Sequence, residues 1–478
     1  MTQAFPQHLR LLAVAAAALL LTGCASVNFD QALSDTRQAT QSVVPNTLEL
    51  RQTSAQHQAA AQRSAQLLQK PLSMADAVEL ALANSPDVQN LLAQSWADMA
   101  RINQSGRIAN PVLSFERNQS LDEVELGRLL SFGLLDLLTL PQRLKVARNQ
   151  TAQANIQLSG DVVDKVAQVR QAWVRAVAAE QTALYAEQVN KAAQASAELA
   201  KRMLQTGNFN KLQRARQHAF YADAVAQLAL ARHAATAARE ELVRQLGLDD
   251  AQAARLKLPD RLPDLPEQAR TATALSAAAM LQRLDVQQAR LQLDSAGKAQ
   301  GLSLLNTLAD VEVGIRRDTI TDTHSGQSSE RKGYEVAIRL PLFDWGGAQR
   351  DAMNAQTLAA ANHYEGVLRA AAPQLREAYS AYRTSYDLAR HYRDEIVPLR
   401  KTMAEENVLR YNAMLIGVFE LLADTREQIT SVMAAINAQQ QFWLADASLS
   451  TALLGKPLAG GVPSLARTAT PSAAGGGH

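Results

Sequence analysis

The chain has 478 residues, with 48 basic and 46 acidic side chains that leave a formal net charge of +2. Hydrophobic residues make up 47% of the sequence but aromatic residues only 5%, because alanine supplies much of the apolar content. This balance, without a basic block interleaved with aromatics, argues against nucleic acid as a partner. An alanine-rich, aromatic-poor chain favours closely packed long helices over a bulky globular core.

The N-terminal segment holds the chain's one cysteine, which excludes an intrachain disulfide and any zinc site built from several thiolates. An apolar run, 11–21, follows Arg10 and is too short to span a bilayer, which takes about 20 residues. It fits the apolar region of a secretory signal. The motif LTGC, which ends at Cys24, resembles a bacterial lipobox. The alternative is an ordinary signal peptide with an incidental cysteine.

The lipobox resemblance implies that 1–23 is a lipoprotein signal peptide, cut before Cys24, whose thiol then carries a diacylglycerol. Acyl chains on a new N-terminus hold a protein at a membrane without a spanning helix. Ala25 follows the cysteine, and the resemblance implies sorting to the outer membrane, since retention at the inner membrane usually goes with Asp there. The segment 24–70 is polar and helix-prone, and we expect it to form a helical tether.

Two similar segments follow, 71–257 and 272–456, and they predict a twofold internal repeat. Each opens a helical pattern at the tripeptide Asp-Val-Gln, at Asp87 and at Asp285. Each then changes to the alternation of apolar and polar side chains that is typical of strands. A proline-rich connector, 258–271, separates the two segments.

Each segment leaves its strands through a proline, Pro141 or Pro341, and enters a very long helical pattern. The first pattern runs over 142–206 and the second over 347–414. Each predicts a helix of roughly 100 Å, at about 1.5 Å per residue. Apolar side chains recur at steps of three and four residues, which is typical of coiled-coil packing.

The second long helix contains Pro373 and Pro398, which we expect to kink or interrupt it. Both long helices turn and come back, and both turns contain the pattern Gly-x-Phe-x-x-Leu-x-x-x-Arg. The return helices close on Gly247 and Gly455, as expected for left-handed caps. The tail, 457–478, is rich in Gly, Ser and Pro and is expected to be disordered.

The alternating segments predict β-hairpins. Apolar side chains alternate with charged or small ones over 311–316 and again over 334–340, with a polar loop between. Outer-membrane barrel strands have this pattern, apolar toward lipid and polar toward a lumen, over about 9–11 residues. The alternative is a soluble amphipathic hairpin that packs on the helices.

The first hairpin begins at Pro111 and is less regular. Its second arm, 126–138, fits either a strand or a helix, because Arg128 and Asp136 fall on its otherwise apolar side. Two hairpins give four strands, which cannot close a barrel, and an open edge cannot lie in lipid. The chain is therefore expected to oligomerise. Eight strands leave an interior filled by side chains, whereas the twelve strands of three copies leave a water-filled passage.

Several stretches together resemble the TolC family of outer-membrane efflux ducts: AVELALANSPDV, LPLFDWGGAQR, RYNAMLIGVFELLADTR and the closing LLG. The resemblance covers 72–455. It implies a mainly α fold of long coiled-coil helical hairpins, with short β-hairpins that form a trimeric membrane β-barrel. It also implies a homotrimer in outer-membrane lipid, a helical barrel that crosses the periplasm, and docking of a periplasmic adaptor that leads to an inner-membrane pump.

The resemblance places helical tips that meet the adaptor at two turns. The tip residues are Gly207, Asn208, Phe209, Leu212, Met414, Leu415, Gly417 and Phe419. Met414 stands where the second tip of the family often has glycine. The two phenylalanines either grip the partner or staple each turn to its own helices. Family ducts often carry an acidic ring near the entrance, and Glu405 and Glu406 are candidates for such a gate; the alternative is a solvated helix face.

No pattern in the sequence points to catalysis. The histidines do not fall at ligand spacing, and no nucleophile elbow, Gly-rich phosphate loop or HExxH motif occurs. We therefore expect a non-enzyme without catalytic residues, metal or cofactor. The expected function is that of the exit duct of a tripartite efflux system, which passively exports small solutes. The alternative is a lipid-anchored periplasmic coiled-coil scaffold with a degenerate or absent barrel, favoured if the arm 126–138 is not a strand.

Overall fold

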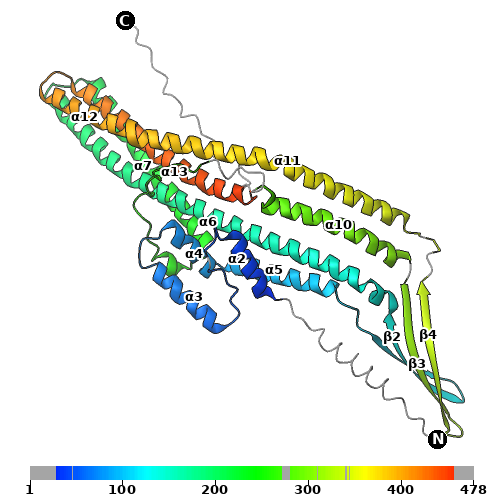
Figure 1. Ribbon diagram of the computed structural model, residues 1–478. Coiled ribbons are helices and arrows are strands. Elements are labelled where there is room, and N and C mark those ends of the chain that lie inside the picture. Colours follow the sequence, from blue (N-terminus) through cyan, green and yellow to red (C-terminus); the bar gives the residue numbers. More distant parts are fainter. Residues whose placement is uncertain are drawn as a thin grey trace. The chain divides into compact units, whose positions relative to one another are not determined.

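The computed structural model describes residues 28–45, 47–271, 280–308, 310–339, 342, 343 and 345–456. Within these residues the chain is mainly helical and carries one sheet of four strands (Figure 1). The predicted signal peptide, Cys24, Pro341 and the tail lie outside the described residues.

The elements follow one another in two similar series of helix, hairpin, long helix and return helix. In chain order they are α2 (Phe29–Thr40), α3 (Ser54–Leu67), α4 (Met74–Asn84), α5 (Pro86–Ser105), β1 (Val112–Gln119), β2 (Glu123–Gly133), α6 (Leu134–Gln205), α7 (Lys211–Leu246), α8 (Asp250–Ala253), α10 (Leu284–Leu308), β3 (Asp310–Asp322), β4 (Ser328–Arg339), α11 (Gly347–His391), a π-helical turn (Tyr392–Ile396), α12 (Val397–Asn412) and α13 (Val418–Leu453).

Contacts divide the chain into two compact units. The sheet unit comprises the described residues within 1–35, 93–155 and 290–362, and the helical unit comprises the rest. Each unit takes parts of both sequence segments, 71–257 and 272–456. The division runs across these segments because β2 of the first pairs with β3 of the second.

The sheet is an antiparallel meander in the order β1-β2-β3-β4 (Figure 1). The pairing of β2 with β3, with Leu130 opposite Ile315, joins the two predicted hairpins into one sheet. The arm that fitted either a strand or a helix is a strand as far as Gly133 and a helix from Leu134. Asp136 therefore lies in α6, where it pairs with Arg143 at 2.7 Å.

The first long helix begins earlier than the sequence predicts. α6 has 72 residues and starts at Leu134 rather than after Pro141, which lies inside it. At about 1.5 Å per residue it is about 108 Å long. Pro141 has no N–H group, so it cannot donate a helical hydrogen bond to the carbonyl of Leu137. The register of β2 against β3 fixes where the chain leaves the sheet, and the helix follows at once.

The second long helix is interrupted at one of its two prolines. α11 continues through Pro373, whereas a π-helical turn, Tyr392–Ile396, separates α11 from α12 just before Pro398. A proline ring clashes with the carbonyl four residues earlier, and a single wider turn is one way to relieve that clash. The expected interruption is thus found at Pro398 and not at Pro373.

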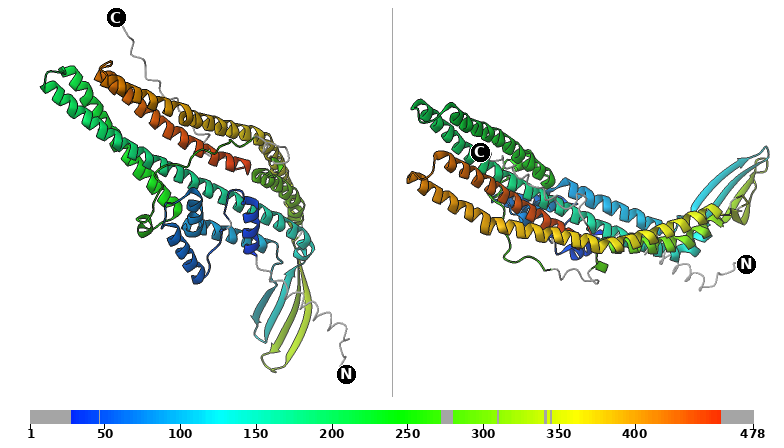
Figure 2. Two further views of the ribbon diagram at one scale, coloured as in Figure 1. Left: turned by 60° about the vertical axis from the view of Figure 1, so that its left-hand side comes forward. Right: turned by 90° about the horizontal axis from the view of Figure 1, so that it is seen from above.

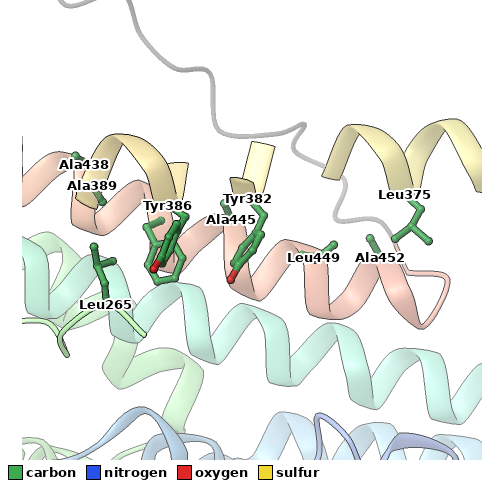
Figure 3. Packing of buried hydrophobic residues seen from close by; sticks show 10 residues of the cluster. Leu265, Leu375, Tyr382, Tyr386, Ala389, Ala438, Ala445, Leu449 and Ala452 are labelled. Atoms are coloured by element: carbon green, nitrogen blue, oxygen red, sulfur yellow. The ribbon is translucent and has the colours of Figure 1, made fainter. Parts of the chain in front are cut away.

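The connector 258–271 packs on the core of the helical unit. Tyr382 and Tyr386 of α11 are buried in one cluster with Leu265 of the connector (Figure 3). Phe442 of α13 belongs to the same cluster. The Tyr386 hydroxyl lies 3.0 Å from the carbonyl oxygens of Pro266 and Glu267. These bonds pin a proline-rich segment, which has few N–H groups of its own, to α11.

Both return helices end at a left-handed glycine, as predicted. Gly247 caps α7 with φ +65°, and Gly455 follows the last turn of α13 with φ +83°. The two glycines pack against equivalent places: Gly247 against Ser85, just before α5, and Gly455 against Arg283, just before α10. In each case a return helix closes onto the start of its own segment.

Candidate functional site

The sheet has one apolar face, which all four strands share. From the pairing register, successive rows on this face contain Val311 and Ile338; Phe132, Val313 and Val336; then Leu113, Leu130, Ile315 and Tyr334. Most of these side chains are exposed in the single chain, and Tyr334 is 86% exposed. Water is a poor environment for such a continuous apolar surface, which marks a site of contact with lipid or protein.

The opposite face of the sheet is charged and internally paired. The guanidinium of Arg316 lies 3.0 Å from Asp318, 3.4 Å from Glu116 and 3.8 Å from Glu335, so that it links β1, β3 and β4. Gly127 of β2 makes room for this cluster, because a Cβ there would come within 3.3 Å of Asp318. This face is suited to contact with water.

The strand lengths suit a membrane. β2, β3 and β4 have 11, 13 and 12 residues, and β1 has 8. A transmembrane strand takes about 9–11 residues. Regular pairing of β2 makes the arm 126–138 a strand as far as Gly133, and this part of the arm counts against a scaffold with a degenerate barrel.

Within the part of the chain that the structure describes, the sheet is open at both sides. β1 and β4 each pair with a single neighbour, which leaves one row of backbone N–H and C=O groups unpaired on each strand. Every residue of β1 is exposed. Free edges of this kind cannot lie in lipid, and pairing with another copy is one way to satisfy them.

The two turns between long helices lie at the same end of the helical unit (Figure 2). In the first, Gly207 has φ +79° and the N–H of Asn208 donates to the carbonyl of Met203 at 2.8 Å. The turn ends at Asn210, whose side chain caps α7 in a reciprocal capping box with Gln213.

The second turn has the same backbone with different residues. Met414 has φ +58°, and the N–H of Leu415 donates to the carbonyl of Arg410 at 2.9 Å. Gly417 is the N-cap of α13, with φ −84°. The structural equivalent of Gly207 is therefore Met414, and the glycine of the shared sequence pattern has different roles in the two turns.

The tip side chains divide into a buried set and an exposed set. Phe209 and Ile416, at equivalent places, are 6% and 8% exposed. This burial favours the alternative in which Phe209 staples the turn to its own helices. Met414 and Leu415 are 93% and 71% exposed. Leu212 is also exposed, whereas the side chain of Phe419 lies outside the described part.

Replacing Met414 by glycine should stabilise the second tip. A left-handed conformation costs a residue with a Cβ about 1–2 kcal/mol, and glycine loses about 0.5–1 kcal/mol more backbone entropy on folding. We expect a net gain of about 0.5–1 kcal/mol, measured as a shift in the midpoint of unfolding. Leu415→Gly is the control, since its φ is not positive; it should destabilise. A Met414→Gly variant that is less stable than Leu415→Gly would contradict this account.

Glu405 and Glu406 lie on α12 and are exposed. Glu405 is 3.9 Å from Lys401, one turn earlier on the same helix. Within one chain they form a solvated pair of carboxylates, and a ring would need other copies.

The sequence patterns did not indicate two carboxylates of α13, one buried and one partly buried. Asp424, near the second tip, is 9% exposed and its Oδ2 atom has no hydrogen-bond partner among the described residues. Asp446 lies 3.0 Å from Arg270, and burial raises the pKa of its carboxyl, an effect that Arg270 and Arg170 counter. In the sequence, each of these carboxylates could have been recognised only as a lone acidic residue within an apolar helical stripe.

The described residues lack two other features of functional sites and membrane proteins. No group of three or more His, Cys, Asp or Glu side chains there is placed to hold a metal ion. Nor does any α-helix in that part of the chain combine the length and hydropathy of a transmembrane helix.

Comparison with known proteins gives a result for structure but not for sequence. No model of a known protein family matches the chain, and no curated protein matches it. Among solved structures, the CmeC outer membrane channel of Campylobacter jejuni matches with a TM-score of 0.68 and 15% identity, over 80% of this chain and 86% of that one. CusC, a protein that forms a transmembrane channel, matches with a TM-score of 0.66 and 17% identity, over 86% of this chain and 96% of that one.

The chain has the fold of outer-membrane channels. The open-state MtrE outer membrane channel of Neisseria gonorrhoeae adds a third example, with a TM-score of 0.63 and 18% identity, over 80% of this chain and 89% of that one. At these identities the likeness concerns the fold. It confirms the TolC-like fold expected from the sequence, and the neighbours with this channel fold are channel proteins rather than enzymes.

Proposed function

We propose that the chain is a lipid-anchored outer-membrane channel, the exit duct of a tripartite efflux system. Three copies would close a twelve-stranded barrel, with the apolar face of each sheet toward lipid and the charged face toward a lumen. The long helices would line a passage through the periplasm. Small solutes would leave passively along it, delivered by a periplasmic adaptor and an inner-membrane pump.

One observation carries this proposal above the others. The sheet has an apolar face, a paired charged face and two open edges, and it belongs to a chain with a channel fold. A soluble scaffold would need to cover the apolar face and the free edges with its own helices. A barrel shared between copies satisfies both at once.

The helical tips are the proposed adaptor site. Met414 and Leu415 present exposed apolar side chains on a turn that accepts backbone strain to hold them there. Methionine is well suited to adaptable contacts. Gly207, Asn208 and Leu212 would contribute from the first tip, and Glu405 and Glu406 would form the acidic ring once three copies meet.

The twofold repeat belongs to the same proposal. Equivalent turns at Gly207 and Met414, and equivalent closures at Gly247 and Gly455, support it. Each repeat would contribute one hairpin of strands and one hairpin of helices, so that three chains give six of each.

Cross-linking between free edges tests the oligomer. Cys24 would be blocked by its lipid, so cysteines placed in the strands would be the reactive thiols. One cysteine at Ser114 of β1 is combined in turn with one at Ser329, Gly333 or Ala337 of β4, on the same face. Oxidation in membranes should give a covalent trimer for the pair whose Cα atoms come within about 7 Å. Each single-cysteine variant is a control, and the absence of trimer from every pair would refute the closed barrel.

Replacing Cys24 by serine should abolish the lipid anchor. We expect the variant to lose incorporation of labelled palmitate and to accumulate as the uncut precursor, because processing requires the modified thiol. The measurement is metabolic labelling with immunoprecipitation, and Ser26→Ala serves as a nearby control that keeps the motif. Labelling that persists in Cys24→Ser would show that the lipid is not on this residue.

A further inference from the structure

Toward the loop ends of the strands, the apolar face of the sheet carries a transverse row of basic side chains. Arg128, Arg317 and Lys332 lie directly opposite one another on β2, β3 and β4, and Arg117 lies diagonally beside Arg128 on β1. The adjacent row on the helix side, which includes Tyr334, is entirely apolar. Phe115 of β1 completes the row, and Leu126 of β2 lies in the next one. The basic row (Arg117, Arg128, Arg317 and Lys332) thus marks the level at which charged side chains first enter the apolar face.

Among the described residues, Glu330 neutralises part of the basic row, since Arg317, Lys332 and Arg128 all act on its carboxylate. Glu330 holds Arg317 through two oxygens, at 2.6 and 2.7 Å. The other three members form no salt bridge with any described residue. Like charges directly opposite one another on neighbouring strands destabilise a sheet. A row with three net positive charges is therefore a surface that an anion would stabilise.

The other face of the same strands shows the contrast. Arg316, next to Arg317 in the chain, pairs with Asp318, and Arg331, next to Lys332, pairs with Glu125. These two basic residues of the charged face thus have partners within the sheet. Among the described side chains of the sheet, the basic residues without a salt bridge lie on the apolar face, which points to a partner outside the chain.

We propose that the basic row binds the phosphate groups of lipid A, the phosphorylated glycolipid of the outer leaflet. This inference rests on the proposed function, which puts the helices in the periplasm and the hairpin loops outside. A charged side chain on the lipid face is costly at the bilayer midplane and nearly neutral at the interface. The row then lies at the outer headgroup level, where phosphates are the abundant anions. Guanidinium groups hold phosphate with two parallel hydrogen bonds.

The test compares lipid binding by the full-length protein and by Arg128→Gln/Lys332→Gln. These substitutions remove two charges that have no salt bridge to lose. Each purified protein is titrated in detergent with lipid A, with lipid A stripped of its phosphates, and with phosphatidylglycerol. We expect the double variant to bind lipid A roughly tenfold more weakly or worse, because charge-assisted hydrogen bonds are lost. The wild-type protein should bind the stripped lipid most weakly, and phosphatidylglycerol, which carries a single phosphate, more weakly than lipid A.

Arg316→Gln/Arg331→Gln is the matched control, since it removes the same number of charges from the opposite face. Its affinity for lipid A should stay within about twofold of wild type. Equal binding of lipid A by wild type and by Arg128→Gln/Lys332→Gln would overturn the inference, and so would equal wild-type binding of lipid A and phosphatidylglycerol. Insertion into liposomes is measured on the same preparations. A protein that inserts without preferring lipid A refutes this inference alone, whereas one that does not insert refutes the proposed function as well.

Discussion

Replacing Gly247 by alanine should destabilise the helical unit by about 3 kcal/mol or more. Gly247 has φ +65°, which costs a residue with a Cβ about 1–2 kcal/mol. The added Cβ would also lie 2.6 Å from the Cα atom of Ser85 and 2.6 Å from the Cδ atom of Pro86. Backbone and a proline ring cannot move aside as a flexible side chain can, so α7 would have to separate from the start of α5. The measurement is the midpoint of unfolding of the purified protein.

Gly207→Ala is the matched control. Gly207 also has a left-handed backbone, with φ +79°, but nothing lies within 4 Å of the added Cβ. It should show the conformational cost of about 1–2 kcal/mol and no more. A Gly247→Ala variant that is no less stable than Gly207→Ala would mean that the closure of α7 onto the start of α5 is not tight.

Replacing Val336 by arginine should prevent stable insertion into the membrane. Val336 is half-exposed on the apolar face, in the row that also contains Val313 and Phe132. An arginine on the lipid face costs about 2–4 kcal/mol per copy near the bilayer midplane. The measurement is the fraction of protein that folds into liposomes and resists extraction by urea or carbonate.

Ala337→Arg tests whether the effect belongs to the face or to the charge. Ala337 is the next residue of β4 and lies on the charged face, opposite Glu312 of β3. An arginine there would face the lumen and should leave insertion unchanged. Equal loss of insertion in both variants would indicate that neither face is in contact with lipid.

The long helices and their ends could be predicted because their signals are local. Gly247 and Gly455 end their helices where a left-handed cap was expected, and the apolar alternation over 311–316 became a strand. The start of α6 could not be predicted, since the sequence signal at Pro141 gives way to the point where β2 leaves the sheet. The pairing of β2 with β3 is likewise a contact between distant parts of the chain, which no local pattern encodes.

The tips show how a sequence pattern can mislead about structural equivalence. The shared Gly-x-Phe pattern aligns Gly207 with Gly417, yet the backbone aligns Gly207 with Met414. A methionine is not expected in a left-handed conformation, because its Cβ is strained there. The sequence indicated one member of the basic row, because Arg128 is a charged residue on an otherwise apolar side of its segment. Its neighbours Arg317 and Lys332 could be assigned to the row only from the strand register.

Single-channel conductance of the purified protein in planar bilayers, with the oligomer mass determined in the same detergent, tests the central claim most directly. The account predicts a trimer that inserts and gives stable openings, because three sheets of four strands leave a water-filled lumen. A monomer or dimer that does not insert would contradict the channel and leave a tethered scaffold.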